Sequence, residues 1–216
     1  MIEEKIKIIC VLRSGGDYTF EYVQNMKNSL DRVIGYRDDW KFICLTDMDP
    51  PIRSDIFIWP ILQNLEGWWS KLEIFKITGA CLYLDLDSVL ISDFSHLFGV
   101  IRSLKKYEFL ALKPFRSSEV WASGIMAWNG DWNKVFNDFK PSDIVVKWDQ
   151  RYIFPKLEKL GATVRAIQGY LMGVYSYKHH CREQLPEDAS IICFHGRPRP
   201  HQAAWINWVK KYWRNA

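Results

Sequence analysis

The stretch CLYLDLDSVL, residues 81–90, decides how this chain folds. Its first half belongs to an apolar run that predicts a buried strand over residues 80–86. Asp85 and Asp87 stand two residues apart at the end of this run, and side chains two apart on a strand project from the same face. Open α/β sheets bind ligands at the carboxyl ends of their strands, so the sequence predicts a ligand site around this acidic pair.

A divalent cation is the ligand that the acidic pair favours. Two carboxylates in an apolar setting are costly unless a cation neutralises them, and oxygen ligands select Mg²⁺ or Mn²⁺. His195 follows the apolar segment 191–194 and is a candidate third protein ligand, which shifts the preference toward Mn²⁺. The alternatives are that both acids cap a loop or a helix start, and that His195 is a loop histidine bonded to backbone.

The N-terminal segment predicts the opening of a nucleotide-binding βα unit. Residues 5–12 form an apolar run that indicates a buried strand, and residues 19–30 carry apolar side chains at helical spacing. Between them, Gly15 and Gly16 allow a ligand to approach the backbone, and the following helix start attracts negative charge. A pair of glycines is also common in plain turns, so this loop alone is not decisive.

The rest of the chain alternates strands with helices. Strands are expected at 41–46, 107–112, 124–128, 163–167 and 191–194, and helices at 68–77, 132–139 and 148–160. Pro155 is expected to kink or split the last of these helices. This alternation predicts an open α/β sheet covered on both faces, in a single domain over residues 1–216.

Composition narrows the class of protein. The chain is 48% hydrophobic and 25% charged, which is typical of a soluble globular domain, and its net charge of +4 is too small for a dedicated nucleic-acid binder. Four of the five cysteines lie in apolar runs and are expected to be reduced core residues, which indicates a cytoplasmic location; they are Cys10, Cys44, Cys81 and Cys193. The sequence predicts neither a signal peptide nor a membrane-spanning segment.

Two other segments need an interpretation. An aromatic and basic helix is expected at about 202–214, and it either lies on an anionic membrane or docks its tryptophans on the domain. The sequence HHC at 179–181 has no companion pair at metal-ligand spacing and is interpreted as a polar loop.

Read onward, the acidic segment becomes YLDLDSVLISDFSHLF (83–98) and resembles glycosyltransferase family 8, where a Tyr-Leu-Asp-x-Asp strand continues through Val and Asp to Leu-Phe. Four further segments resemble the family's motifs in the same order. They are WSKL (69–72), SGIMAWN (123–129), WDQ (148–150) and FHGRPRPH (194–201). The resemblance covers nearly the whole chain, and its specificity lies in the order of the five pieces.

The resemblance implies a GT-A fold, the Rossmann-like α/β fold of nucleotide-diphospho-sugar transferases, with an open mixed sheet flanked by helices. It implies metal-dependent transfer of a sugar, with retention, from a nucleotide diphosphate donor. A UDP-sugar is the expected donor, and a glycan, lipid-linked or protein acceptor is left open. Mn²⁺ or Mg²⁺ is the implied cofactor, with Asp85, Asp87 and His195 as its ligands.

The resemblance also implies roles for individual residues. Asp149 would bind hydroxyls of the donor sugar, Gln150 would lie near the anomeric carbon, and Lys71 would be the basic residue before the acidic motif. By their charge, Lys71 and Arg199 are candidates for neutralising the leaving diphosphate. The expected donor-binding residues are Leu12, Arg13, Tyr18, Lys71, Asp85, Ser123, Gly124, Gly196 and Arg199.

Two competing functions remain open. The segment DLDSVL (85–90) is also close to the signature of haloacid-dehalogenase-like phosphatases, in which the first Asp attacks phosphate and the second is a general acid or base. Against this, the segment is not on the first predicted strand, Ser88 stands where the signature has Gly, and no convincing second acidic motif follows. The third hypothesis is a non-catalytic module that binds a sugar or nucleotide.

Overall fold

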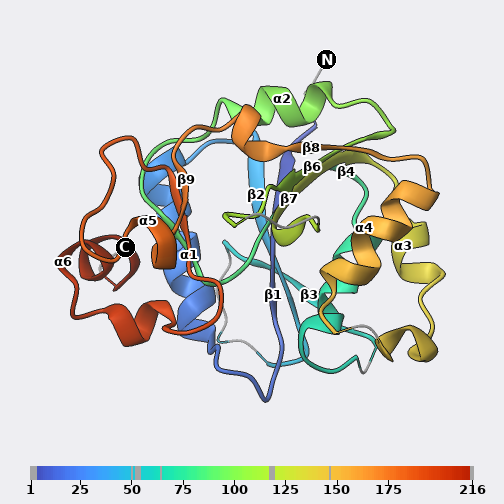
Figure 1. Ribbon diagram of the computed structural model, residues 1–216, viewed down its shortest axis with the longest axis horizontal. Coiled ribbons are helices and arrows are strands. Elements are labelled where there is room, and N and C mark those ends of the chain that lie inside the picture. Colours follow the sequence, from blue (N-terminus) through green and yellow to red (C-terminus); the bar gives the residue numbers. More distant parts are fainter. Residues whose placement is uncertain are drawn as a thin grey trace.

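A central seven-stranded sheet organises the computed structural model, which describes residues 4–49, 51, 55–63, 65–116, 120–145 and 147–214. The strand order is β3-β2-β1-β4-β7-β6-β8 (Figure 1). The strands are β1 (Ile6–Leu12), β2 (Trp40–Thr46), β3 (Phe57–Pro60), β4 (Gly79–Leu84), β6 (Glu108–Leu112), β7 (Ala122–Gly130) and β8 (Thr163–Ala166). Neighbouring strands run parallel except that β7 lies antiparallel to both β4 and β6, so the sheet is mixed.

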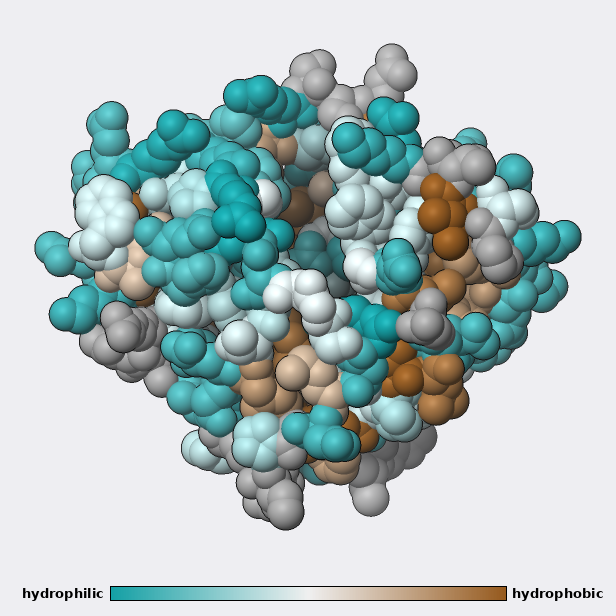
Figure 2. Space-filling model, turned by 90° about the horizontal axis from the view of Figure 1, so that it is seen from below, coloured by the Kyte–Doolittle hydropathy of each residue, from teal (hydrophilic) through white to brown (hydrophobic). Residues whose placement is uncertain are grey.

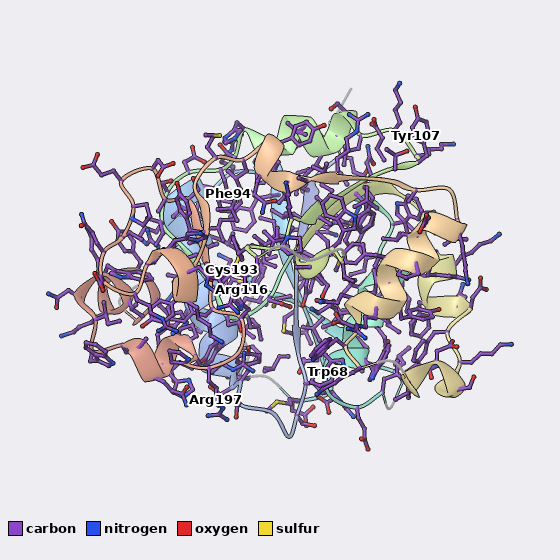
Figure 3. The ribbon with its side chains drawn as sticks, in the orientation of Figure 1. Trp68, Phe94, Tyr107, Arg116, Cys193 and Arg197 are labelled. Carbon is purple, nitrogen blue, oxygen red and sulfur yellow. The ribbon has the colours of Figure 1, made fainter. Side chains whose placement is uncertain are left out.

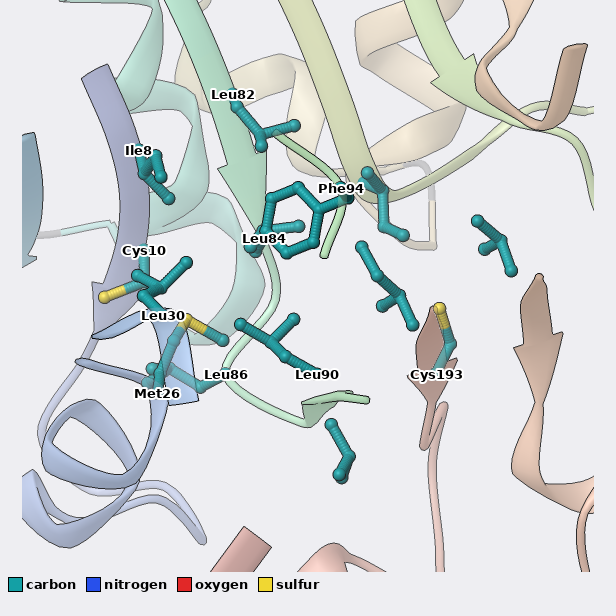
Figure 4. Packing of buried hydrophobic residues seen from close by; sticks show 14 of the residues in the cluster. Ile8, Cys10, Met26, Leu30, Leu82, Leu84, Leu86, Leu90, Phe94 and Cys193 are labelled. Carbon is teal, nitrogen blue, oxygen red and sulfur yellow. The ribbon is translucent and has the colours of Figure 1, made fainter. Parts of the chain in front are cut away.

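Alternating side chains of the central strands pack into a core on each face of the sheet. From β1 and β4, Ile8 and Leu82 point toward helix α1 (Phe20–Ile34), whose buried residues include Met26 and Leu30 (Figure 4). On the opposite face, residues such as Cys81 belong to a second cluster, which three helical segments cover. These are the 3₁₀ helix η1 (Gly67–Lys76), α3 (Asn133–Asn137) and α4 (Gln150–Lys159). The sheet is therefore covered on both faces, as the alternation of elements predicted.

A small second sheet lies beside α1 and continues directly from the acidic motif. Its strands are β5 (Ser88–Leu90), β9 (Val174–Ser176) and β10 (Ile191–Cys193), in the order β5-β10-β9. The remaining elements are α2 (Leu97–Ser103), η2 (Pro141–Val145), η3 (Ile167–Gly169), α5 (Tyr177–His180), η4 (Pro200–Ala203), α6 (Asn207–Val209) and η5 (Lys210–Arg214).

Several sequence expectations differ from the structure. The helix predicted at 148–160 is one continuous helix through Pro155, because that residue is exposed while Ile153, Phe154 and Leu157 hold the buried face on the domain. The helix predicted at about 202–214 consists of the separate turn η4 followed by the short segments α6 and η5.

The C-terminal segment docks two of its tryptophans on the domain. The Trp213 ring lies 5.0 Å from that of Tyr22, and Trp208 packs near Tyr177. Trp205 is 80% exposed. Docking, one of the two interpretations of this segment, therefore holds for Trp208 and Trp213.

The cysteine prediction is confirmed, because all five cysteines are buried and form no disulfide. Burial raises the pKa of the thiols of Cys10, Cys81 and Cys193, as expected for core residues. Within the described residues, no helix combines the length and the apolar character needed to cross a bilayer.

Candidate active site

A cavity of about 980 Å³ opens at the carboxyl ends of β1 and β4. Figure 2 looks at this side of the molecule and shows it hollowed near the centre. Most of the predicted site residues line this one cavity: Arg13, Tyr18, Lys71, Asp85, Asp87, Ser123, Gly124, Asp149, Gln150, His195, Gly196 and Arg199. Leu12 does not, because its side chain is fully buried in the core beneath.

Lys71 is the centre of a buried ion-pair network on one wall of the cavity. Its Nζ lies 2.9 Å from Oδ1 of Asp85 and 3.1 Å from Oδ2 of Asp149. Ser123 donates a hydrogen bond of 2.8 Å to Oδ2 of Asp149, and Lys71 donates one of 3.1 Å to the Ser123 hydroxyl. Burial alone would lower the pKa of Lys71, but the two carboxylates outweigh it and raise that pKa, so the ammonium group stays charged.

Asp85 follows the last residue of β4 and is held in one orientation. The Tyr83 hydroxyl donates to its Oδ1 at 2.5 Å, and its backbone N–H donates to the carbonyl of Gly124 on the neighbouring strand. A Cβ on Gly124 would lie 3.2 Å from Oδ2 of Asp85. The glycine therefore leaves space around the carboxylate oxygen that Lys71 does not hold.

Asp87 is held by a different set of partners, on the side of the cavity near α1. Its Oδ2 accepts hydrogen bonds of 2.7 Å from the Tyr18 hydroxyl and 2.7 Å from Arg199. Its backbone carbonyl accepts from the N–H of Phe194, which joins the acidic motif to the end of β10. Burial and the nearby charge of Asp85 raise the pKa of Asp87 to about 7, against the lowering effect of Tyr18 and Arg199.

The two carboxylates fit a hard divalent cation in their chemistry. The hydrogen bonds of Asp85 engage Oδ1 and those of Asp87 engage Oδ2, so among the described residues one oxygen of each is left for a ligand. Burial first, and then the neighbouring carboxylate of Asp85, raise the pKa of Asp87, and both effects favour a bound cation between the two acids.

His195 lines the same cavity but is not gathered with the carboxylates into a closed metal centre. Its Nε2 lies 2.7 Å from the Ser176 hydroxyl, and its ring stacks on Phe115. Partial burial, Lys178 and other nearby positive groups lower the pKa of His195 to about 4, which keeps the imidazole neutral. Within the part of the chain that the structure describes, no three His, Cys, Asp or Glu side chains lie close enough together to hold a metal. Metal binding through all three predicted ligands stays a prediction.

Some residues of the cavity were not predicted from the sequence. Asp17 accepts from Arg197 at 3.1 Å and lies 3.5 Å from Nε of Arg199, while Arg116 and His179 also line the cavity. Nothing local in the sequence identifies them, since their elements meet only in the folded chain. The nearest signal was the HHC segment at 179–181, whose first residue the fold brings to this wall.

Comparison with known proteins defines the class of fold. The mixed sheet, its flanking helices and the acidic pair after β4 form a fold of GT-A type, and similar solved structures are glycosyltransferases. Neither protein-family models nor curated proteins give a match to this chain.

Two glycosyltransferases illustrate the likeness. The apo form of GlyE from Streptococcus pneumoniae TIGR4 has a TM-score of 0.67 at 16% identity, over 98% of this chain and 60% of GlyE; a second GlyE structure has a TM-score of 0.66 at 15% identity. The apo structure of the bifunctional enzyme WbbM has a TM-score of 0.58 at 10% identity, over 97% of this chain and 51% of WbbM. This chain thus spans about half to three-fifths of the length of these proteins, and at such identities the likeness establishes the fold alone.

Proposed function

We propose that this protein is a metal-dependent glycosyltransferase that moves a sugar from a nucleotide diphosphate donor, a UDP-sugar, to a hydroxyl of a glycan or related acceptor. The observation that carries the proposal is the meeting of Asp85 and Asp87 with Lys71 and Asp149 in one cavity at the carboxyl ends of β1 and β4. The likeness to glycosyltransferases of GT-A type supports it.

The reaction breaks the bond between the anomeric carbon and the diphosphate oxygen and forms a bond from that carbon to the acceptor oxygen, whose proton is released. Asp85 and Asp87 would hold a Mn²⁺ or Mg²⁺ ion, which would stabilise the negative charge that develops on the diphosphate. The oxygen of Asp85 beside Gly124 and the oxygen of Asp87 away from Tyr18 are the ones open to that ion.

The chain's own residues would position the donor. Lys71 holds Asp85 and Asp149 at fixed distances, so the carboxylate for the metal and the carboxylate for the sugar hydroxyls keep their relative placement. Gln150 follows Asp149 at the start of α4 and also lines the cavity, where it would lie near the anomeric carbon. Retention of the anomeric configuration is part of the proposal and is read from the product by NMR.

The test measures release of free nucleotide. The protein is incubated with UDP-, GDP- and CMP-sugars in the presence of Mn²⁺, Mg²⁺ or a chelator, and liberated nucleotide is quantified. We expect UDP release that requires the metal, and a loss of roughly a hundredfold in Asp87→Asn, the scale seen when one charge-stabilising group is removed from an active site. Asp38→Asn is the control, because Asp38 is exposed and precedes β2, at the amino ends of the parallel strands and away from the cavity.

Other outcomes assign other functions. Unchanged metal response and turnover in Asp87→Asn would show that the site is wrong. Hydrolysis of an aryl phosphate through a covalent phosphate on Asp85 would establish the phosphatase alternative. Tight binding of a nucleotide sugar without turnover, with every acceptor offered, would leave a binding module.

A further inference from the structure

Lys71 and Arg199, which the sequence suggested as partners of the diphosphate, already pair with carboxylates in the structure. Lys71 lies between Asp85 and Asp149, and Arg199 contacts Asp87 at 2.7 Å. Three carboxylates thus share two cations, and this network keeps a net negative charge. A divalent ion reverses that charge only slightly, whereas a diphosphate brings at least two further negative charges.

Two neighbouring arginines also form ion pairs with carboxylates. Arg13 pairs with Asp47, and Arg197 pairs with Asp17 at 3.1 Å. An anion entering the cavity therefore requires cations that no carboxylate already neutralises.

Such cations lie on another wall of the cavity, formed by the loop after β6, by α5 and by residues 195–196 after β10. Arg116, His179 and Cys193 line the cavity, and Figure 3 labels Arg116 and Cys193 in the same region of that view. Lys178 reaches the same wall, because its Nζ lies 3.0 Å from the position of a Cβ on Gly196. Among the described residues, neither Arg116 nor Lys178 has a carboxylate within ion-pair distance.

Contacts of neighbouring residues join the wall that carries these two cations to the acidic motif. The Phe115 ring, next to Arg116, stacks on the His195 ring at 5.8 Å. Cys193 pairs with Ser88 across β10 and β5, and the Phe194 N–H donates to the carbonyl of Asp87. Strand β10, which leads into this wall, therefore lies directly beside β5, which follows the acidic motif.

Gly196 leaves room for a ligand against this wall. Its φ of +79° is disfavoured for other residues, and any Cβ there would crowd Lys178.

We infer that Arg116 and Lys178 bind the diphosphate of the nucleotide donor, between their wall and the cation held by Asp85 and Asp87. This inference rests on the proposed function. Arg116 supplies a planar pair of donors to phosphate oxygens and Lys178 supplies a point charge, so the leaving group would be neutralised by cations other than Lys71 and Arg199, which already pair with carboxylates.

The experiment measures binding rather than turnover. Dissociation constants for inorganic pyrophosphate, UDP and uridine are measured by calorimetry, with Mn²⁺ and with a chelator, for the wild type and for Arg116→Gln/Lys178→Gln. The control is Arg182→Gln, which removes one positive charge from the residues just after α5, outside the cavity lining. We expect pyrophosphate and UDP to bind about tenfold more weakly to the double variant, with uridine and the control unchanged.

The outcomes separate this inference from the proposed function. If nucleotide sugars are turned over and the double variant binds pyrophosphate and UDP like the wild type, the inference is wrong and the proposed function stands. In that case, a loss of turnover with only one acceptor would assign the two cations to a phosphate of that acceptor. If pyrophosphate binding depends on Arg116 and Lys178 but no nucleotide sugar is used, the anion site stands and the proposed function fails.

Discussion

Lys71 is a buried ammonium group whose charge is balanced from two sides, and this arrangement determines what its loss would do. In Lys71→Met, Asp85 and Asp149 would face each other without a cation. Breaking a buried pair costs about 3–5 kcal/mol, and the part-exposed side of Asp85 reduces this, so we expect the free energy of unfolding to fall by about 2 kcal/mol. Urea denaturation measures the change.

A double-mutant cycle separates the ion pair from the packing of the lysine stem. Combined with Asp149→Asn, Lys71→Met should cost at least about 1 kcal/mol less than the sum of the two single changes, because the unpaired carboxylate is gone. Lys159→Met, at the exposed end of α4, serves as the control and should change stability by less than about 0.5 kcal/mol. Strictly additive effects of the two single substitutions would show that the pair is not coupled.

At the scale of elements, the small sheet depends on a glycine at its entrance. Gly173 has a φ of +74°, its carbonyl accepts from the backbone N–H of Ser190 and Ile191, and a Cβ would lie 1.9 Å from the carbonyl oxygen of Asp188. We therefore expect Gly173→Ala to lower the free energy of unfolding by about 3 kcal/mol or more.

Gly161→Ala is the matched control for this prediction. Gly161 has a similar φ of +83° but nothing within 4 Å of a Cβ, so its substitution should cost only about 1–2 kcal/mol from backbone strain. Equal losses in the two variants, measured by thermal or urea denaturation, would show that β9 and β10 tolerate a shift at this entrance.

Elements could be predicted from the sequence where a periodic pattern ran long enough. The long core strands and α1 have such patterns, and the structure confirms them within a few residues of the expected bounds. Strands β5 and β9 are three residues long, which is too short for a period to appear. Strand β3 has the sequence FIWP, which is apolar throughout, so it shows no alternation of apolar and polar side chains although all four residues are exposed.

The residues of the site also differ in whether a local sequence pattern could identify them. Asp85 and Asp87 could be recognised because they stand two residues apart after one predicted strand. In the structure β4 ends at Leu84, two residues earlier than predicted, and Asp87 lies in the turn before β5 and not on the strand itself. Their partners could not be derived from spacing, because Arg199 lies 112 residues from Asp87 and Tyr18 lies 69 residues before it. Sequence order also says nothing about which cations are already paired, and that decides which of them remain for an anion.

At the scale of the whole molecule, the C-terminal segment packs back onto α1 beside the cavity. Trp213 is 4% exposed and lies against Tyr22, whose hydroxyl contacts His201. Loss of a buried tryptophan costs about 3–5 kcal/mol, but the Trp213 indole N–H has no acceptor among the described residues. We therefore expect Trp213→Ala to lower the free energy of unfolding by about 2 kcal/mol.

Trp205→Ala provides the comparison within the same segment, because Trp205 is 80% exposed and its removal should change stability by less than about 0.5 kcal/mol. Both variants are compared by urea denaturation followed by circular dichroism. Because η5 lies against α1 and β5, loosening it in Trp213→Ala should also release Tyr18 and Asp87, and affinity for UDP should fall with stability. Full UDP affinity in a destabilised Trp213→Ala would show that the C-terminal segment supports the fold without supporting the site.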